Sequence, residues 1–191
     1  MTEPTARAGV IWTVDDLELF PDDTVRREII AGELFVSRAP HPDHQDVVRR
    51  LCTALDLWNR TYRLGRLYVG IGIVFSPTDA VIPDLVWASH ARWARIVDPE
   101  GRLVGAPELV VEVLSPSAED ARRDRELKRK LYAVYGVDEY WIVDRQGQAV
   151  ELYRRAGDVL ERAATLRAGD TLRSPLLPDF ALPVAAVFAD E

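Results

Sequence analysis

Several features that define common protein classes are missing from this chain of 191 residues. It contains a single cysteine, Cys52, so no internal disulfide and no cysteine zinc cluster can form. A chain with so little cysteine is typical of a reducing compartment, and we expect a cytoplasmic location. No apolar run approaches the ~18 residues needed to span a bilayer, and the N-terminus lacks the apolar core of a secretory signal. The sequence therefore predicts no membrane partner.

The motifs of several enzyme classes are absent as well. Neither the phosphate-binding loop GxxxxGK(S/T) nor the nucleophile elbow GxSxG occurs. The glycines Gly70 and Gly72 lack the third glycine and the following helix of a dinucleotide-binding turn. His41 and His44 have no third histidine nearby, which argues against a histidine zinc site.

The composition that remains is ordinary for one globular domain. Hydrophobic residues make up 48% of the chain and charged residues 29%, and the length suits a single domain, residues 1–191, with a sizeable core. The net charge of −7 argues against nucleic-acid binding by bulk electrostatics, because phosphate contacts need Lys and Arg. One local basic stretch, RRDRELKRK at 122–130, is present, and from charge alone it reads as a solvent-exposed helix face.

Hydrophobic periodicity predicts alternating strands and helices. The chain between about 90 and 106 is expected to be irregular. A buried strand, a helix and a second buried strand in succession imply a right-handed crossover between parallel strands. We therefore expect an α/β or α+β fold, in which helices flank a mixed sheet with additional antiparallel strands. The expected elements are a helix capped by Thr13, a hairpin around Ala31 and Gly32, a helix over 43–62, strands over 66–75, 82–89 and 109–114, a helix from Ser117 to Gly136, a strand over 139–144, an antiparallel pair at 149–155 and 159–166, and a short helix over 182–189.

Two acidic residues stand out against this pattern. Glu112 is the one charge within the apolar strand 109–114, and a carboxylate there is costly unless a cation or hydrogen bonds compensate it. Metal ligation and a structural role, in which the carboxylate pairs with a buried Arg or lies at a strand end, are equally compatible with this position. Asp84 follows Pro83 at the start of a short apolar strand, and carboxylates from neighbouring strands can converge on Mg²⁺. A Pro-Asp pair is also a common turn signal.

The helix after Ser117 carries a polar stripe and an apolar face. Asp120, Asp124, Lys128 and Tyr132 recur every four residues and share one side of the helix. Lys128 could reach over the strand end that carries Glu112 and orient an attacking water. The alternative is a surface ion pair with Asp124, worth a few tenths of a kcal/mol. The predicted apolar face consists of Leu127, Leu131 and Val134.

Two further polar residues are weaker candidates. His44 lies near the start of the first long helix, where it could serve as a ligand or a proton acceptor. Glu28 lies in a strand beside Ile29 and Ile30, and alternation alone favours a solvent-facing side chain.

The order of these segments resembles a known family. REIIAGEL is followed by His44 on a helix, then by IPDLVW, PELVVEVLSPS, a helix with Lys128 and Tyr132, and GVDEYWIVD. This arrangement closely resembles the Uma-type restriction endonuclease family, long described as a domain of unknown function, within the PD-(D/E)XK nuclease superfamily. The similarity covers residues 11 to 185, and PELVVEVLSPS and GVDEYWIVD are its specific parts.

The resemblance implies a restriction-endonuclease-like core and assigns roles to individual residues. Asp84 matches the aspartate of the Pro-Asp motif, and Glu112 matches the acid of the (D/E)XK motif. Leu114 stands where the lysine of that motif belongs, and the resemblance nominates Lys128 on the next helix instead. Family positions also coincide with Glu28, His44 and Tyr132.

The activity that the resemblance implies is metal-dependent hydrolysis of DNA. Asp84 and Glu112, with Glu28 as an additional ligand, would bind Mg²⁺ or Mn²⁺, and Lys128 would position the attacking water. Superfamily nucleases often act as homodimers, which would place one site on each DNA strand. Weaker candidates for backbone contacts are Arg122, Arg123 and Arg125.

Two alternatives remain open from the sequence. The chain could be a catalytically inactive nucleic-acid-binding or regulatory domain on the same fold, which Leu114 and the negative net charge favour. It could also be a structural or interaction protein that holds Glu112 in an ion pair.

Overall fold

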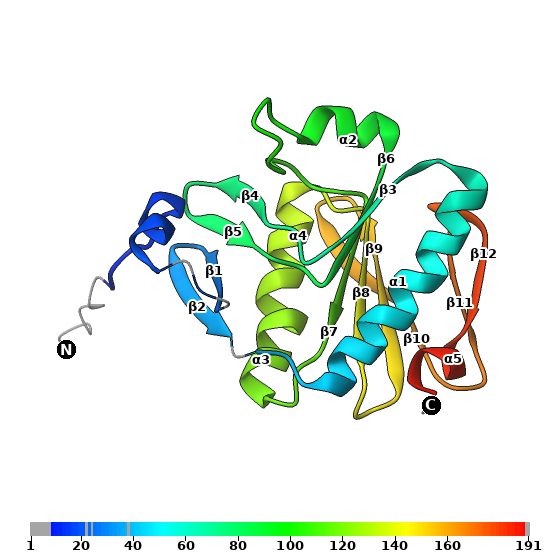
Figure 1. The fold of residues 1–191 in the computed structure, drawn as a ribbon. Coiled ribbons are helices and arrows are strands. Elements are labelled where there is room, and N and C mark those ends of the chain that lie inside the picture. The colour runs from blue at the N-terminus through cyan, green and yellow to red at the C-terminus, as the bar shows by residue number, and fades with distance from the viewer. Residues whose placement is uncertain (1–8, 22, 24, 38, 190–191) are drawn as a thin grey trace.

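A mixed six-stranded sheet forms the centre of the molecule (Figure 1). The computed structural model describes residues 9–21, 23, 25–37 and 39–189. Within the sheet, β7 and β8 are parallel, and the other neighbouring strands are antiparallel. This arrangement confirms the expected mixed sheet and its parallel crossover. The strands, in spatial order, are β10 (Val159–Leu166), β9 (Ala149–Ala156), β8 (Glu139–Asp144), β7 (Leu109–Val113), β6 (Leu85–Ser89) and β3 (Gly65–Val69).

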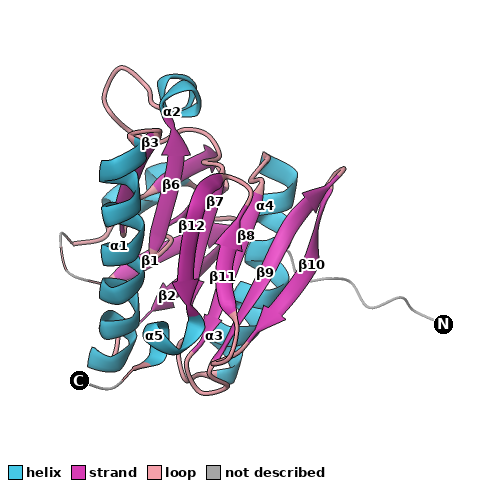
Figure 2. Cartoon of the chain, turned by 90° about the vertical axis from the view of Figure 1, so that its right-hand side faces the viewer, coloured by secondary structure: helices cyan, strands magenta, loops and turns pink. Residues whose placement is uncertain are grey.

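One face of the sheet is covered by α1 (Pro42–Tyr62), α5 (Val184–Phe188) and the hairpin of β11 (Thr171–Ser174) and β12 (Leu177–Pro183) (Figure 2). α1, α5 and the hairpin bury their apolar side chains in one core with the sheet. None of the helices in the described part of the chain is both long and apolar enough to span a membrane.

The other face is covered by one long helical segment. It consists of α3 (Ala118–Arg122), a π-helical turn, η2 (Arg123–Lys128), and α4 (Arg129–Tyr135). The segment begins at Ser117, whose side chain accepts a hydrogen bond from the Asp120 N–H, and it ends at Gly136 in the left-handed region. Both predicted ends are therefore confirmed.

The predicted apolar face of this helical segment is wrong in part. Val134 is 76% exposed and Leu127 is 39% exposed, whereas Leu131 is buried as expected. The polar residues Asp124 and Lys128 are buried instead. The π-helical turn explains the difference, because its wider i to i+5 bonding shifts the side chains relative to a regular helix. A pattern read at 3.6 residues per turn therefore assigns the wrong side chains to the core.

A smaller antiparallel sheet lies beside the long helical segment, with the spatial order β2, β1, β5 and β4. The hairpin of β1 (Arg26–Ile30) and β2 (Glu33–Ser37) turns at Ala31 and Gly32, as predicted. The short helix η1 (Val14–Leu19) precedes it and begins after Thr13, also as predicted. The other two strands are β4 (Ile73–Ser76) and β5 (Asp79–Val81).

Two predictions about the middle of the chain need correction. The single strand predicted over 66–75 is divided between two sheets, because Gly70 adopts a positive φ of 60° and ends β3. The stretch expected to be irregular contains a helix, α2 (His90–Ile96), which Ser89 caps. In this helix only Ile96 is buried, so no apolar stripe marks it in the sequence.

The pairing of β3 with β6 depends on a glycine at the first position of β3. A Cβ atom at Gly65 would collide with the Ala88 carbonyl oxygen and would lie 2.8 Å from ring carbons of Trp87. We expect Gly65→Ala to lower the free energy of unfolding by about 1–3 kcal/mol, as measured by urea denaturation.

The matched control is Gly72→Ala, because a Cβ at Gly72 would meet no atom within 4 Å. This control is expected to change the free energy of unfolding by less than about 0.5 kcal/mol. Equal effects of the two substitutions would contradict the packing described for β3 and β6.

Candidate active site

Buried polar side chains from four elements surround a cavity of about 270 Å³ between the two sheets, α1 and the π-helical turn. Asp84 directly precedes β6, Glu112 lies on β7, and His44 lies in the first turn of α1. Lys128 ends the π-helical turn. The structure thus brings four residues that the sequence singled out to one cavity. Its lining also includes Arg26, Arg123 and Asp124.

Asp84 is buried and has cationic or N–H partners on both oxygens. Its Oδ1 accepts a hydrogen bond of 3.1 Å from Arg26 Nη1, and its Oδ2 accepts one of 2.8 Å from the Val113 N–H. His44 Nε2 lies 3.2 Å from Oδ2. Burial would raise the pKa of Asp84, but His44, Arg26 and the Val113 N–H outweigh it and lower the pKa. The carboxylate is therefore held in its charged form.

Glu112 is 2% exposed, and among the described residues both of its side-chain hydrogen bonds are accepted by the same oxygen. Oε1 accepts hydrogen bonds of 2.8 Å from Lys128 Nζ and 2.9 Å from the Tyr132 hydroxyl. Burial raises the pKa of Glu112 strongly, and the nearby carboxylates of Asp84 and Asp124 raise it further, while Lys128 acts in the opposite direction. The charged form of Glu112 thus depends on a neighbouring cation.

Lys128 is the centre of a second group of contacts. Its Nζ lies 2.9 Å from Glu28 Oε1, 2.8 Å from Glu112 Oε1 and 3.6 Å from Asp124 Oδ1. Burial alone would lower the pKa of Lys128, but the three carboxylates raise it, so the ammonium stays charged. The lysine is 1% exposed, and the alternative of a surface ion pair with Asp124 is therefore wrong.

Glu28 belongs to the same cluster. It is 1% exposed, which corrects the expectation from strand alternation that it faces solvent. Its Oε1 accepts a hydrogen bond of 2.7 Å from the Ile82 N–H in addition to the Lys128 contact. β1 belongs to the small sheet packed beside the long helical segment, so the outward side of this strand is not open to water.

The sequence did not identify two members of this site. Arg26, the partner of Asp84, lies at the first position of β1 and belongs to no recognisable motif. Asp124 is 5% exposed and lines the cavity, and within the described residues its Oδ1 has no hydrogen-bond partner. Asp124 lies four residues before Lys128, and this spacing could have indicated that it belongs to the site. The regular helical pattern assigned it to the surface instead.

The donor chemistry of the cavity suits a hard divalent cation. Asp84, Glu112 and Asp124 supply carboxylate oxygens, which Mg²⁺ and Mn²⁺ prefer. Within the described residues, however, no three His, Cys, Asp or Glu side chains lie close enough together to hold an ion. The residues fit a divalent cation by type, and in the structure the Lys128 ammonium neutralises Glu112 instead.

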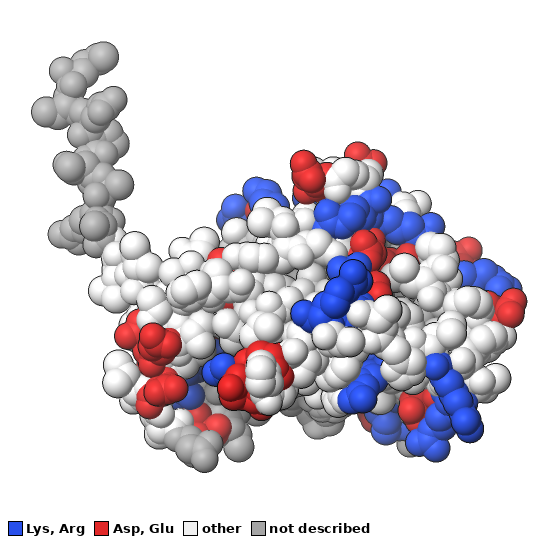
Figure 3. All heavy atoms as spheres, turned by 90° about the horizontal axis from the view of Figure 1, so that it is seen from above, with Lys and Arg blue, Asp and Glu red and all other residues white. Residues whose placement is uncertain are grey.

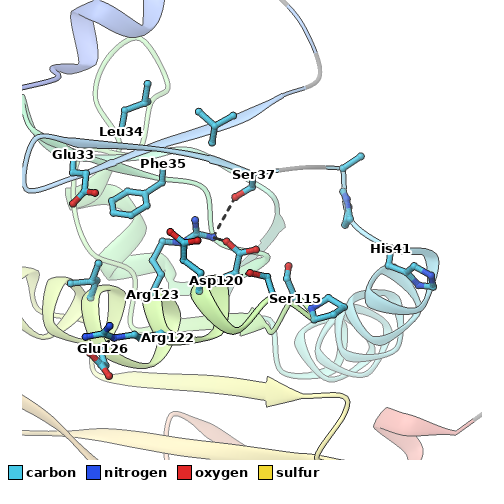
Figure 4. A pocket seen from close by; sticks show the side chains of 17 residues that line it. Glu33, Leu34, Phe35, Ser37, His41, Ser115, Asp120, Arg122, Arg123 and Glu126 are labelled. Atoms are coloured by element: carbon cyan, nitrogen blue, oxygen red, sulfur yellow. Dashed lines mark hydrogen bonds and ion pairs between the residues drawn. The ribbon is translucent and has the colours of Figure 1, made fainter. Parts of the chain in front are cut away.

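A wide groove of about 1000 Å³ leads from the cavity between β2 and the start of the long helical segment (Figure 4). Arg123 lines both the groove and the cavity. Its guanidinium donates a hydrogen bond of 3.3 Å to Ser37 Oγ, lies 3.2 Å from Asp120 and stacks 5.5 Å from the Phe35 ring. Arg123 therefore bridges the two walls where groove and cavity meet.

The other two arginines of the basic stretch point elsewhere. Arg122 lines the groove, is mostly exposed and pairs with Glu126 at 3.2 Å. Arg125 lines a separate pocket of about 430 Å³ and pairs with Asp144 and Glu151, each at 2.8 Å. The three arginines expected to act together are thus distributed over two pockets.

The ion pair of Asp84 with Arg26 and its hydrogen bond from the Val113 N–H make the stability of the protein depend on pH. Because the folded pKa of Asp84 lies below its ordinary value of 3.8, this stabilisation is present above that pH and is lost as the pH falls through the folded pKa. We expect Asp84→Asn to lower the free energy of unfolding by about 3 kcal/mol near neutral pH. Urea denaturation at several pH values should show the difference from wild type shrinking below 3.8.

The control for this prediction is Asp46→Asn, which removes a carboxylate from the exposed side of α1. Its effect on the free energy of unfolding should stay within about 0.5 kcal/mol. A destabilisation by Asp84→Asn that is equally large at acidic and neutral pH would contradict the ionised state of Asp84.

Comparisons with known proteins agree with this fold. A crystal structure described as that of a putative nuclease belonging to DUF820, from Anabaena variabilis, superimposes with a TM-score of 0.74. The two sequences are 19% identical, and the match covers 92% of this chain and 97% of the other. No curated protein matches the chain. Residues 14–185 match the Uma2 family, whose description is "putative restriction endonuclease". The chain therefore belongs to the Uma2 family, as the motifs of its sequence indicated.

Proposed function

We propose that this protein is a divalent-metal-dependent endonuclease that hydrolyses phosphodiester bonds of DNA at the 270 Å³ cavity. The observation that carries the proposal is the position of Asp84 and Glu112. Asp84 directly precedes β6, Glu112 lies on the neighbouring strand β7, and both line one cavity together with a buried lysine. Membership in the Uma2 family supports a nucleic-acid substrate. The proposal does not require the side chains of this site to match those of the Anabaena protein.

Asp84 and Glu112 are the proposed ligands of Mg²⁺ or Mn²⁺, and Glu28 is a further acid of the same cluster. When bound, such a cation polarises the scissile phosphate and lowers the pKa of water. His44 and the Val113 N–H hold Oδ2 of Asp84 in place, and Tyr132 holds Oε1 of Glu112. These contacts fix the orientation of both carboxylates before substrate arrives.

Lys128 takes the role of the lysine that is missing from β7. Leu114 lies in the core beneath the long helical segment, so it offers no charge to the site. Lys128 approaches the same acid from the helix, with Nζ 2.8 Å from Glu112 Oε1. In the proposed reaction it orients the attacking water and offsets the negative charge that develops on the phosphate.

The groove is the proposed path of the DNA backbone. Arg123 at its inner end and Arg122 on its wall are placed to contact phosphates, and Arg26 lies at the cavity beside Asp84. Arg125 lines the separate 430 Å³ pocket, where it pairs with Asp144 and Glu151, so it lies off this path.

The opposite end of the molecule, around α2, carries basic and acidic side chains side by side (Figure 3). There Arg102 pairs with Asp98 at 2.7 Å.

Glu112→Gln tests the proposal in a plasmid-nicking assay with Mg²⁺ and with Mn²⁺. The substitution keeps the shape of the side chain but removes the charge that the cation requires. We expect the wild type to nick the plasmid and the variant to lose more than about 100-fold in rate. Glu139→Gln is the matched control, because Glu139 is a buried acid on the adjacent strand that pairs with Arg154.

Retained cleavage by Glu112→Gln would remove Glu112 from the proposed site. If the wild type binds DNA but cleaves it under no condition, the protein is the alternative, a nucleic-acid-binding domain on a nuclease fold. Cleavage that persists in EDTA would contradict the metal dependence.

A further inference from the structure

The Lys128 ammonium occupies the side of Glu112 that faces the other carboxylates. It lies 2.8 Å from Glu112 Oε1 and 2.9 Å from Glu28 Oε1, and it is 1% exposed. The two arginines that line the cavity contact other carboxylates, since Arg26 lies 3.1 Å from Asp84 and Arg123 lies 3.2 Å from Asp120. Lys128 is therefore the group that neutralises Glu112 in the structure.

A second cation at Glu112 would compete with this ammonium. Like charges repel, and the repulsion is stronger in a buried site than in water because the effective dielectric constant is lower. When Glu112 binds a divalent cation, the Lys128 ammonium is expected to move away from Oε1. The ammonium would keep Glu28 Oε1, 2.9 Å away, and would need a second carboxylate in place of Glu112, because a poorly compensated buried ammonium is costly.

Asp124 is placed to be that partner. Its Oδ1 lies 3.6 Å from Lys128 Nζ, and within the described residues this buried oxygen has no hydrogen-bond partner. Arg123 Nε is 4.0 Å away, beyond hydrogen-bonding distance. Glu28 Oε2 is likewise buried without a partner in the described part of the chain. Glu28 already contacts Lys128 through Oε1, so among the described residues Asp124 Oδ1 is the nearby acceptor that can replace Glu112.

We propose that Asp124 is a positioning residue that receives the Lys128 ammonium when Glu112 binds a divalent cation. This inference rests on the proposed metal site. Asp124 and Lys128 both lie on the π-helical turn, so a short movement of the lysine side chain exchanges one carboxylate for the other without moving the helix. The exchange keeps Lys128 charged and inside the cavity, where the proposed reaction requires it.

A double-mutant cycle read by Mn²⁺ binding separates this role from direct ligation. Mn²⁺ is titrated by calorimetry into the full chain as wild type, Asp124→Asn, Lys128→Gln and the double variant. Lys128→Gln removes the competing charge and should tighten Mn²⁺ binding at least about fivefold. Asp124→Asn should weaken binding about fivefold where Lys128 is present, because the displaced ammonium then has Glu28 as its only carboxylate partner among the described residues. In the Lys128→Gln background the same substitution should change affinity less than about twofold.

Each departure from this pattern overturns the proposal. If Asp124→Asn weakens binding equally in both backgrounds, Asp124 is a direct ligand of the cation. If Lys128→Gln weakens binding, the ammonium supports the site rather than competing with it. Glu126→Gln is the control, since Glu126 is an exposed acid of the same π-helical turn that pairs with Arg122, and it should leave Mn²⁺ affinity unchanged.

A second measurement needs no variant at Lys128. The chain has two lysines, Lys128 and Lys130, so protein labelled with ¹⁵N-lysine has two side-chain ammonium groups. Lys128 is buried and Lys130 is exposed, which distinguishes their signals by the rate of hydrogen exchange. Addition of Mg²⁺ should shift the Lys128 signal and leave Lys130 unchanged. In Asp124→Asn, Mg²⁺ should instead broaden the Lys128 signal, because the ammonium retains only the Glu28 carboxylate among the described residues and its hydrogens exchange faster with water.

If calorimetry shows Mg²⁺ binding but the Lys128 signal stays unchanged, the proposed exchange of carboxylate partners is wrong, whereas the proposed metal site stands. Absence of any Mg²⁺ or Mn²⁺ binding would overturn both the inference and the proposed metal site. A shifted Lys128 signal without DNA cleavage would leave the inference standing and contradict the proposed function.

Discussion

The buried contact between the Lys128 ammonium and the carboxylates of Glu28, Glu112 and Asp124 is the interaction on which this structure depends. Three carboxylates cannot be buried together without a compensating charge. The lysine supplies that charge and connects β1, β7 and the π-helical turn, which come from distant parts of the chain. The contact therefore holds together the elements that form the cavity, as well as the residues that are proposed to act there.

The topology explains how one helix can replace a missing lysine on a strand. β7 and β8 are parallel, so the connection between them crosses the face of the sheet, and the long helical segment lies directly over Glu112. Val110, on the same face of β7 as Glu112, and Leu114, which directly follows β7, pack in the core beneath this segment. A lysine on the helix can therefore contact the Glu112 carboxylate as a lysine on the strand would, but it approaches from the helix that packs on the sheet.

The sequence identified the acids of the site better than their partners. Glu112 was recognisable as a charge within an apolar strand, and Asp84 as an acid that follows a proline just before one. The mixed sheet followed from a strand, helix and strand in succession. The sequence pattern placed Asp124 at the surface because it assumes a regular helical period, which the π-helical turn breaks. It placed Glu28 at the surface because strand alternation assigns that side to solvent, whereas the small sheet covers it. Arg26 has no local signal, since its role arises from an ion pair across 58 residues of chain.

The most direct test of the account is a crystal structure of the protein grown with Mn²⁺, with the anomalous signal used to locate the ion. The account predicts one strong peak in the cavity, in contact with carboxylate oxygens of Asp84 and Glu112, and Lys128 Nζ closer to Asp124 than to Glu112. A peak outside the cavity, or a fully occupied ion at Glu112 with Lys128 still bonded to Oε1, would contradict it.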